Sequence, residues 1–196
     1  ASLAAGKPVN APVRPTLADG LAVGRVGDRS FALAAPRVDR VLTVDEQALS
    51  LAVLRLLELE KTSCEGAGAA ALAALMGEAG QELKGRKVVL LLCGGNIDPT
   101  VLHRVIDHGL AVDGRLWRFT ATVSDRPGGM AKLTQVIADA GASVLEINHD
   151  RAFSGPEVFS TTVEVTVETA DHDHIQALRE RLHEADFGVI SATGCR

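Results

Sequence analysis

The sequence contains no tyrosine, one tryptophan and five phenylalanines among 196 residues, so aromatic residues make up only 3% of the chain. Hydrophobic residues still reach 46%, which predicts a core built mostly from aliphatic side chains. The chain also has no excess of positive charge, because it contains 20 lysines and arginines and 25 aspartates and glutamates, which gives a formal charge of -5. This composition excludes the basic surface that nucleic-acid-binding domains need.

Long apolar runs and targeting signals are missing as well. No apolar stretch approaches the length of a membrane-spanning helix, and the first ten residues lack the apolar core of a signal peptide. The three cysteines, Cys64, Cys93 and Cys195, do not have the spacing of metal ligands. Few cysteines without such spacing favour a reducing, cytoplasmic location.

Histidine-rich segments offer no metal site either. Asp171-His172-Asp173-His174 stands at a predicted helix start, where aspartate acts as a cap and histidine lies at the surface. His103 and His108 are five residues apart, which is not the i, i+4 spacing of two ligands on one helix. We therefore predict that the chain binds no metal.

The most informative stretch is the apolar run at 88–92 followed by Cys93-Gly94-Gly95-Asn96-Ile97-Asp98. The run predicts a strand buried on both faces. The two glycines allow a sharp turn and a close approach of the backbone to a neighbour. Asp98 and Pro99 predict a helix with Asp98 as its N-cap. Glycines between a strand and a helix N-terminus are typical of a ligand site in open α/β sheets, although an ordinary strand–turn–helix junction explains the spacing equally well.

Further elements of the first half follow from periodicity and caps. Prolines at 6–15 indicate an extended connector. We expect a short helix at 16–24, a strand at 38–44, a long helix at 45–61 capped by Thr43 or Asp45, a small-residue helix at 65–76 and a helix from Pro99 to His108 that Gly109 ends.

The second half reads as strand–helix–strand–strand–helix–strand, which is the ferredoxin-like order. The expected strands are 116–123, 142–150, 158–168 and 187–193, with helices at about 129–140 and 171–185 and a loop at 151–156. Trp117 is expected in a core or an interface. The chain is thus expected to have two domains, residues 1–113 and 114–196.

Three stretches of the first half resemble threonine ammonia-lyase (threonine dehydratase), a pyridoxal-phosphate enzyme of fold type II. Cys93-Gly94-Gly95-Asn96 resembles its Ser/Cys-Gly-Gly-Asn motif, and 16–23 and 65–70 resemble its Ala-Asp-Gly and Glu-Gly-Ala-Gly-Ala segments in the same order. The resemblance implies that Cys93 lies beside the pyridine nitrogen of pyridoxal 5'-phosphate. It also implies that Gly94, Gly20 and Glu65 bind the cofactor in the same pocket, although packing alone also accounts for a buried cysteine and an alanine-rich helix.

The second half resembles an ACT domain, a regulatory module that binds amino acids, on the residues at 125–133 and 141–151. The resemblance implies an effector site at Gly128, Gly129 and Asn148 and pairing into a homo-oligomer. Backbone N–H groups at a helix N-terminus suit a carboxylate. Alternatively, the glycines only make the turn, and Asn148 lies on an exposed strand face. Isoleucine or valine is the implied effector, with serine and threonine open.

The chain departs from the family where the chemistry is performed. The glycine-rich phosphate loop and the segment that carries the Schiff-base lysine are missing, and the lysines present lack that setting: Lys7, Lys61, Lys84, Lys87 and Lys132. We therefore expect the C-terminal part of a catalytic domain followed by an ACT domain, inactive by itself, as a fragment or a truncated product. The intact enzyme would convert threonine to 2-oxobutanoate and ammonia, with allosteric regulation in isoleucine biosynthesis. The alternative is an amino-acid-binding or dimerisation module with a vestigial catalytic remnant.

Overall fold

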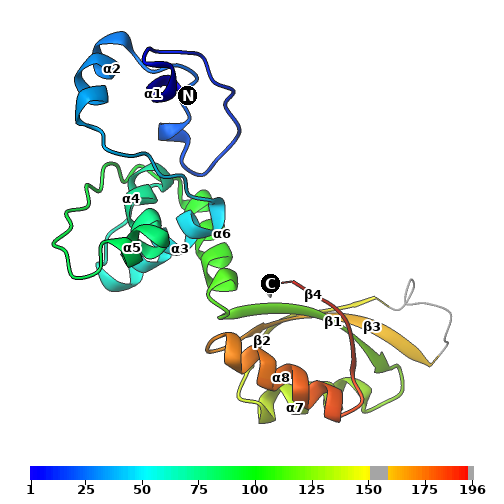
Figure 1. The fold of residues 1–196 in the computed structure, drawn as a ribbon. Coiled ribbons are helices and arrows are strands. Elements are labelled where there is room, and N and C mark those ends of the chain that lie inside the picture. Colours follow the sequence, from blue (N-terminus) through cyan, green and yellow to red (C-terminus); the bar gives the residue numbers. More distant parts are fainter. Residues whose placement is uncertain (151–158, 194–196) are drawn as a thin grey trace. The chain divides into compact units, whose positions relative to one another are not determined.

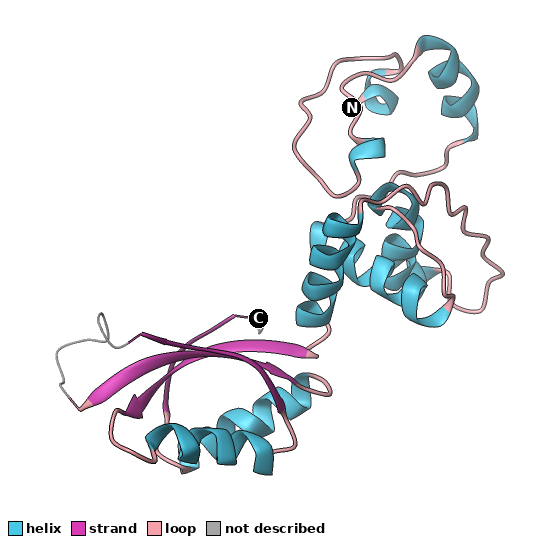
Figure 2. Cartoon of the chain, turned by 180° about the vertical axis from the view of Figure 1, so that it is seen from behind, coloured by secondary structure: helices cyan, strands magenta, loops and turns pink. Residues whose placement is uncertain are grey.

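The computed structural model describes residues 1–150 and 159–193 (Figure 1). Its contacts divide the chain into two compact units, Ala1–Gly109 and Leu110–Arg196. All described strands lie in the second unit, and the first unit consists of helices and extended segments (Figure 2). Among the described residues no helix is both long and apolar enough to cross a membrane.

The second unit is a four-stranded antiparallel sheet with two helices on one of its faces (Figure 2). Along the chain it comprises β1 (Leu116–Ser124), α7 (Gly129–Asp139), β2 (Ser143–Asp150), β3 (Ser160–Glu168), α8 (His172–Glu184) and β4 (Gly188–Thr193). The strand order in the sheet is β2-β3-β1-β4. The ferredoxin-like prediction is confirmed, and the loop expected at 151–156 lies outside the described residues.

Strict alternation builds the core of this unit. Val163, Val165 and Val167 on β3 are fully buried, and they pair with Ala121, Phe119 and Trp117 on β1, which are equally buried. Because neighbours in register share a face, all of these side chains point toward the helices. The helices contribute Leu133 and Ile137 from α7 and Ile175, Leu178 and Leu182 from α8. Trp117 stacks on Phe119 with 4.5 Å between ring centroids, so its predicted core position is confirmed.

The first unit is organised by three helices, α3 (Glu46–Leu59), α4 (Gly66–Met76) and α6 (Pro99–Val112), of which α6 continues past the division between the units. Shorter elements are α1 (Ser2–Ala5), η1 (Asp19–Leu21), α2 (Asp28–Ala34), η2 (Ala35–Arg37) and α5 (Glu78–Glu82). Two predicted caps are confirmed. The Asp45 carboxylate accepts from Ala48 N at 2.8 Å, and Asp98 Oδ1 accepts from Thr100 N at 2.7 Å. Each cap satisfies an N–H group that has no partner within its helix.

Neither strand expected in the first unit forms. Residues 38–44 and 88–92 are extended without ladder hydrogen bonds, and Val89 and Leu91 are 94% and 76% exposed instead of buried. A strand exists only when a neighbour pairs with its N–H and C=O groups, and residues 1–109 supply no such neighbour.

Two helix predictions also need correction. The helix expected at 16–24 is reduced to η1. The last helix does not end at Gly109 but runs to Val112. Gly109 is buried, and a Cβ there would lie 3.1 Å from the Leu54 Cβ and the Ser50 carbonyl oxygen on α3. This glycine therefore permits close helix packing and is not a stop signal. The short helices α1, α2 and α5 were not expected from the pattern.

Candidate functional site

The N-terminus of α4 is where the three motifs of the first half meet. Its first turn, Gly66-Ala67-Gly68, carries almost no side chain, so other segments approach the backbone closely. A Cβ on Gly66 would lie 2.6 Å from Leu17 Cγ, and one on Gly68 would lie 2.6 Å from Cys64 Sγ and collide with the Cys93 carbonyl oxygen. The glycines at these positions therefore allow the segments at 16–21 and 93–95 to reach the same helix end.

Glu65, the N-cap residue of α4, lies between the other two motifs. Its backbone N–H donates to the Gly94 carbonyl oxygen at 3.3 Å. Gly94 has a φ of +94°, and a Cβ there would collide with the Glu65 carboxylate. The position of a Cβ on Gly20 lies 3.8 Å from Glu65 Oε1. The structure thus brings Gly20, Glu65 and Gly94 together, although they are far apart in the sequence.

A cavity of about 460 Å³ opens beside this meeting point. Gly20 and Glu65 line it, together with Asp19, Asn96 and Asp98. Cys93 and Gly94 are not among its lining residues, and the Cys93 side chain is exposed. The Thr100 hydroxyl, with the N–H groups of Thr100 and Val101, holds the pKa of Asp98 below its usual range. The cavity therefore has a polar wall with an ionised carboxylate at the start of α6.

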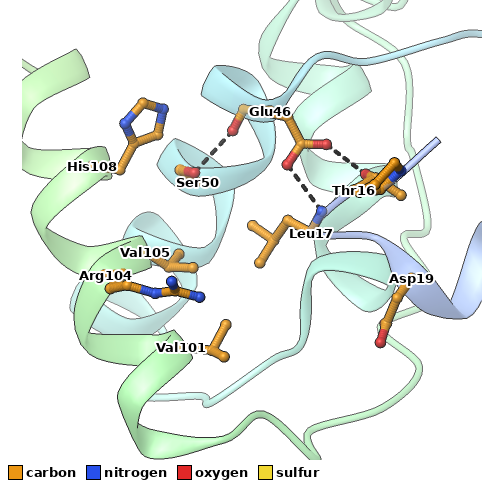
Figure 3. Close-up of a pocket in the computed structure, with 10 residues that line it drawn as sticks. Thr16, Leu17, Asp19, Glu46, Ser50, Val101, Arg104, Val105 and His108 are labelled. Carbon is orange, nitrogen blue, oxygen red and sulfur yellow. Dashed lines mark hydrogen bonds between the residues drawn. The ribbon is translucent and has the colours of Figure 1, made fainter.

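A larger cavity of about 680 Å³ lies between α3, α6 and residues 15–19 (Figure 3). Figure 3 shows that Glu46 on α3 holds the 16–17 segment, because its carboxylate accepts from the Thr16 hydroxyl and from Leu17 N, the latter at 2.9 Å. Sequence reasoning missed this anchor, although an acidic residue at a helix start is a visible signal. None of the predicted site residues lines this second cavity, so we assign it only the role of positioning the segment before Gly20.

In the second unit, a cavity of about 270 Å³ lies where β1 meets α7. Gly128, with a φ of +97°, lines it, as do Arg126, Met130, Asp125 and His149. His149 Nε2 is 3.9 Å from Asp125 Oδ1. The loop that the sequence predicts as the effector site therefore lines a cavity through Gly128.

Asn148 does not reach this cavity. It pairs with Glu164 in the sheet, whereas His149 pairs with the fully buried Val163. Because successive residues of a strand point to opposite faces, Asn148 lies on the face opposite to the helices. Its side-chain amide donates to Glu146 at 3.2 Å. Sequence reasoning could not tell which of the two adjacent polar residues lines the cavity, since the register that decides the face was unknown.

Gly129 lies in close contact with the end of β1. A Cβ on Gly129 would collide with the Ser124 carbonyl oxygen and lie 3.2 Å from the Ser124 Cβ, whereas one on Gly128 would meet no atom within 4 Å. Gly129 therefore allows α7 to start against the end of β1, and it does not line the cavity.

Side chains of the histidine-rich segment at the start of α8 form hydrogen bonds with backbone groups. Asp171 accepts from His174 N at 2.8 Å as the N-cap. His174 uses both ring nitrogens, since Nδ1 accepts from Ala170 N at 3.0 Å and Nε2 lies 2.8 Å from the Ala140 carbonyl oxygen. No cluster of potential metal ligands occurs in the part of the chain that the structure describes.

Comparison with known proteins defines the class first. Residues 1–94 match the family model of pyridoxal-phosphate dependent enzymes, and residues 119–187 match that of the ACT domain. The chain therefore consists of the C-terminal part of a pyridoxal-phosphate-dependent enzyme domain of fold type II followed by an ACT domain.

The particular relatives are threonine ammonia-lyases, so the resemblance seen in the sequence is confirmed. The chain is 37% identical over 189 residues to L-threonine ammonia-lyase of Thermotoga maritima and 40% identical over 188 residues to that of Geobacter sulfurreducens, each alignment covering 96% of the chain. It covers 47% and 46% of these relatives, which is about half of their length. A solved structure of threonine deaminase isoform 2 from Solanum lycopersicum matches 55% of this chain and 32% of its own, with 29% identity and a TM-score of 0.50.

Proposed function

We propose that this chain is the C-terminal portion of a threonine ammonia-lyase, which forms 2-oxobutanoate and ammonia from threonine with pyridoxal 5'-phosphate as cofactor. The observation that carries the proposal is the meeting of Gly20, Glu65 and Gly94 at the N-terminus of α4. These three motifs are the ones in which the sequence resembles the family. The names of the relatives support the same activity.

The residues present fit one wall of a cofactor site. When bound, pyridoxal phosphate supplies an electron-accepting ring that makes the Cα proton of an attached amino acid acidic. Gly20, Glu65 and Gly94 would hold part of this group, since the space beside the Glu65 carboxylate is kept free by the absence of a Cβ on Gly94. Cys93, exposed at the same turn, would place a neutral thiol at the pyridine nitrogen and leave that nitrogen unprotonated, which favours elimination.

The chain has no lysine in this wall, because none lines the cavity of about 460 Å³. We therefore predict that the 196-residue chain forms no 2-oxobutanoate from threonine, whereas the product of the longest reading frame that contains it does. Both proteins would be assayed with added pyridoxal phosphate. Activity of the 196-residue chain above a blank would contradict the assignment of a partial site, and no activity of the longer product would contradict the proposed function.

In the active longer enzyme, Cys93→Asp tests the role of the thiol. A carboxylate at this position would raise the pKa of the pyridine nitrogen, so the rate of elimination should fall and side reactions such as racemisation should increase. Cys93→Ser, which keeps a neutral group, is the matched control and should retain the product ratio. An unchanged product ratio and rate in Cys93→Asp would remove Cys93 from the cofactor site.

For the second unit we propose an amino-acid effector site at Gly128, with His149 and Arg126 in place of Asn148 as the polar side chains. The first turn of α7 and the Arg126 guanidinium would bind the carboxylate. The cavity of about 270 Å³ also presents Val123 and Met130, which suits a branched aliphatic side chain such as that of isoleucine or valine. We further propose that the unit pairs with a second copy.

Calorimetry with isoleucine, valine, threonine and serine tests this site. We expect binding of a branched-chain amino acid, a loss of at least tenfold in affinity in His149→Ala and no change in Asn148→Ala, its neighbour on the opposite face. Weaker binding in Asn148→Ala with unchanged binding in His149→Ala would return the site to the opposite face. No heat with any of the four amino acids would remove it. Sedimentation of the same protein would report the pairing.

A further inference from the structure

The two cysteines of the first unit lie at the same backbone junction. Cys64, directly before the N-cap of α4, is 1% exposed, and its thiol donates to the Gly94 carbonyl oxygen at 3.3 Å. Cys93 precedes that carbonyl by one residue and is exposed. Both are free thiols.

Gly68 shows how close the two residues are. The position that a Cβ would take there is 2.6 Å from Cys64 Sγ and is overlapped by the Cys93 carbonyl oxygen. The Cys64 sulfur and the Cys93 backbone therefore lie on two sides of one small space, which is open only because residue 68 is a glycine. The hydrogen bond from Glu65 N to the Gly94 carbonyl oxygen, at 3.3 Å, ties the two segments together beside it. Adjacent segments held in this way can bring two cysteines within the Cβ separation that a disulfide requires.

We propose that Cys64 and Cys93 form a reversible disulfide, so that the turn at Gly94 is a site of thiol oxidation. The co-reactant is a small-molecule disulfide such as oxidised glutathione. The Cys93 thiolate attacks one of its sulfurs and releases one glutathione thiolate, which gives a mixed disulfide. The Cys64 thiolate then attacks the Cys93 sulfur and displaces the second glutathione. Two protein thiols are oxidised by two electrons, and their two protons end on the two glutathione thiols that leave.

The order of these steps follows from exposure. Cys93 is open to solvent and meets the reagent first, whereas Cys64 is shielded and reacts only within the protein. Burial, with smaller contributions from Glu65 and Cys93, raises the pKa of the Cys64 thiol, so a smaller fraction of it is thiolate and the first attack on the reagent falls to Cys93. The bond would draw the Cys93 sulfur toward Gly68. If the proposed function holds, this movement takes the thiol away from the pyridine nitrogen.

The experiment uses the 196-residue chain with Cys195→Ser, so that only the two cysteines in question remain. It is incubated with oxidised glutathione, blocked with N-ethylmaleimide and digested with trypsin. Because Lys84 and Lys87 separate the two cysteines, cleavage yields the peptides 62–84 and 88–104, and a disulfide joins them. We expect this joined peptide in the oxidised sample and its loss on reduction.

Two single variants make the result decisive. In Cys64→Ser, Cys93 should carry one glutathione and no cross-link should form. In Cys93→Ser, Cys64 should remain unmodified because it is buried. The proposal is overturned if the protein with both cysteines yields only the glutathione adduct on Cys93, as Cys64→Ser does. The measurement needs neither cofactor nor activity, so its failure and the failure of the proposed function are distinguishable.

Discussion

The two units differ in whether their apolar segments find partners. In the second unit, every strand pairs with at least one neighbour, and one face of the sheet is covered by α7 and α8. In the first unit, α3 and α4 pack through a small core that includes Leu49, Val53 and Ala69, whereas the extended segments 38–44 and 88–92 leave valine and leucine side chains exposed. Similar sequence patterns therefore lead to paired strands in one unit and to unpaired extended segments in the other.

The comparison shows that a strand-forming sequence is only half of the information that a strand needs. The run at 88–92 has the composition of a strand buried on both faces, yet a buried strand requires neighbours on both edges and a layer on each face. In the second unit, about eighty residues contain all four strands of the sheet, so each strand finds its neighbours within the unit. The strands expected in the first unit do not find theirs within residues 1–109, and the relatives of this chain are about twice as long.

The largest effect is expected when the two units are separated. Residues 110–196 alone should unfold in one cooperative thermal transition, because the apolar faces of that unit are paired within it. Residues 1–109 alone should unfold at a lower temperature and over a broader range, and their exposed segments 38–44 and 88–92 should bind a dye for exposed apolar surface. Circular dichroism and dye fluorescence report both. A transition in residues 1–109 as sharp as that in residues 110–196 would contradict this difference between the units.

A second prediction compares one leucine from each unit. Leu133 on α7 is fully buried, and Leu133→Ala should lower the free energy of unfolding of the second unit by about 2–5 kcal/mol. Leu91 is 76% exposed, and Leu91→Ala should leave the stability unchanged to within about 0.5 kcal/mol. Chemical denaturation of the two variants measures both changes. A cost for Leu91→Ala similar to that for Leu133→Ala would show that residues 88–92 are packed.

Gly129 provides a smaller, local test of the second unit. Gly129→Ala places a Cβ against the Ser124 carbonyl oxygen, and such overpacking should cost about 1–3 kcal/mol. Gly188→Ala at the start of β4 is the control, since a Cβ there meets no atom within 4 Å, and it should cost less than about 0.5 kcal/mol. Equal effects in the two variants would mean that Gly129 does not hold α7 against β1.

The smallest effect concerns the cap of α6. The pKa of Asp98 is lowered from its ordinary value of 3.8, first by the Thr100 hydroxyl and then by backbone N–H groups. A carboxyl with a lowered folded-state pKa stabilises the folded state above its ordinary pKa, and this contribution is lost as the pH falls through the lowered value. Hydrogen exchange of the Val101 amide should therefore be slower than in Asp98→Asn near neutral pH. The two should converge below the folded-state pKa, and a difference that persists there would contradict the assignment to the charged carboxylate.

Much of the second unit could be predicted from the sequence, because each of its elements has a clear local sequence pattern. The alternation of Val163, Val165 and Val167 and the turn at Gly128 and Gly129 determine where the elements begin and which face is buried. The caps at Asp45 and Asp98 were equally visible. The sequence does not reveal that His149 lines the cavity and Asn148 does not, since this depends on strand register. It also does not reveal that the run at 88–92 forms no strand, because that depends on a partner that no local pattern shows.

In the first unit, the motifs predicted the meeting of Gly20, Glu65 and Gly94 only through resemblance. The physical reason became visible in the structure, where Gly66, Gly68 and Gly94 each leave room for another backbone or for the Glu65 carboxylate. The anchoring of Thr16 and Leu17 by Glu46 links segments thirty residues apart, and neither hydrophobic periodicity nor spacing encodes it.

Hydrogen exchange of the complete 196-residue chain, read peptide by peptide, tests the central claim most directly. The claim is that every strand of the second unit has a partner within that unit, whereas residues 38–44 and 88–92 have no strand partner. We predict protection of at least about a thousandfold for amides of β1 and β3, because their exchange requires unfolding of the unit, and exchange of 88–92 close to that of an unstructured peptide. Protection of 88–92 comparable to that of β1 would contradict the account, because it would show that this run is already paired.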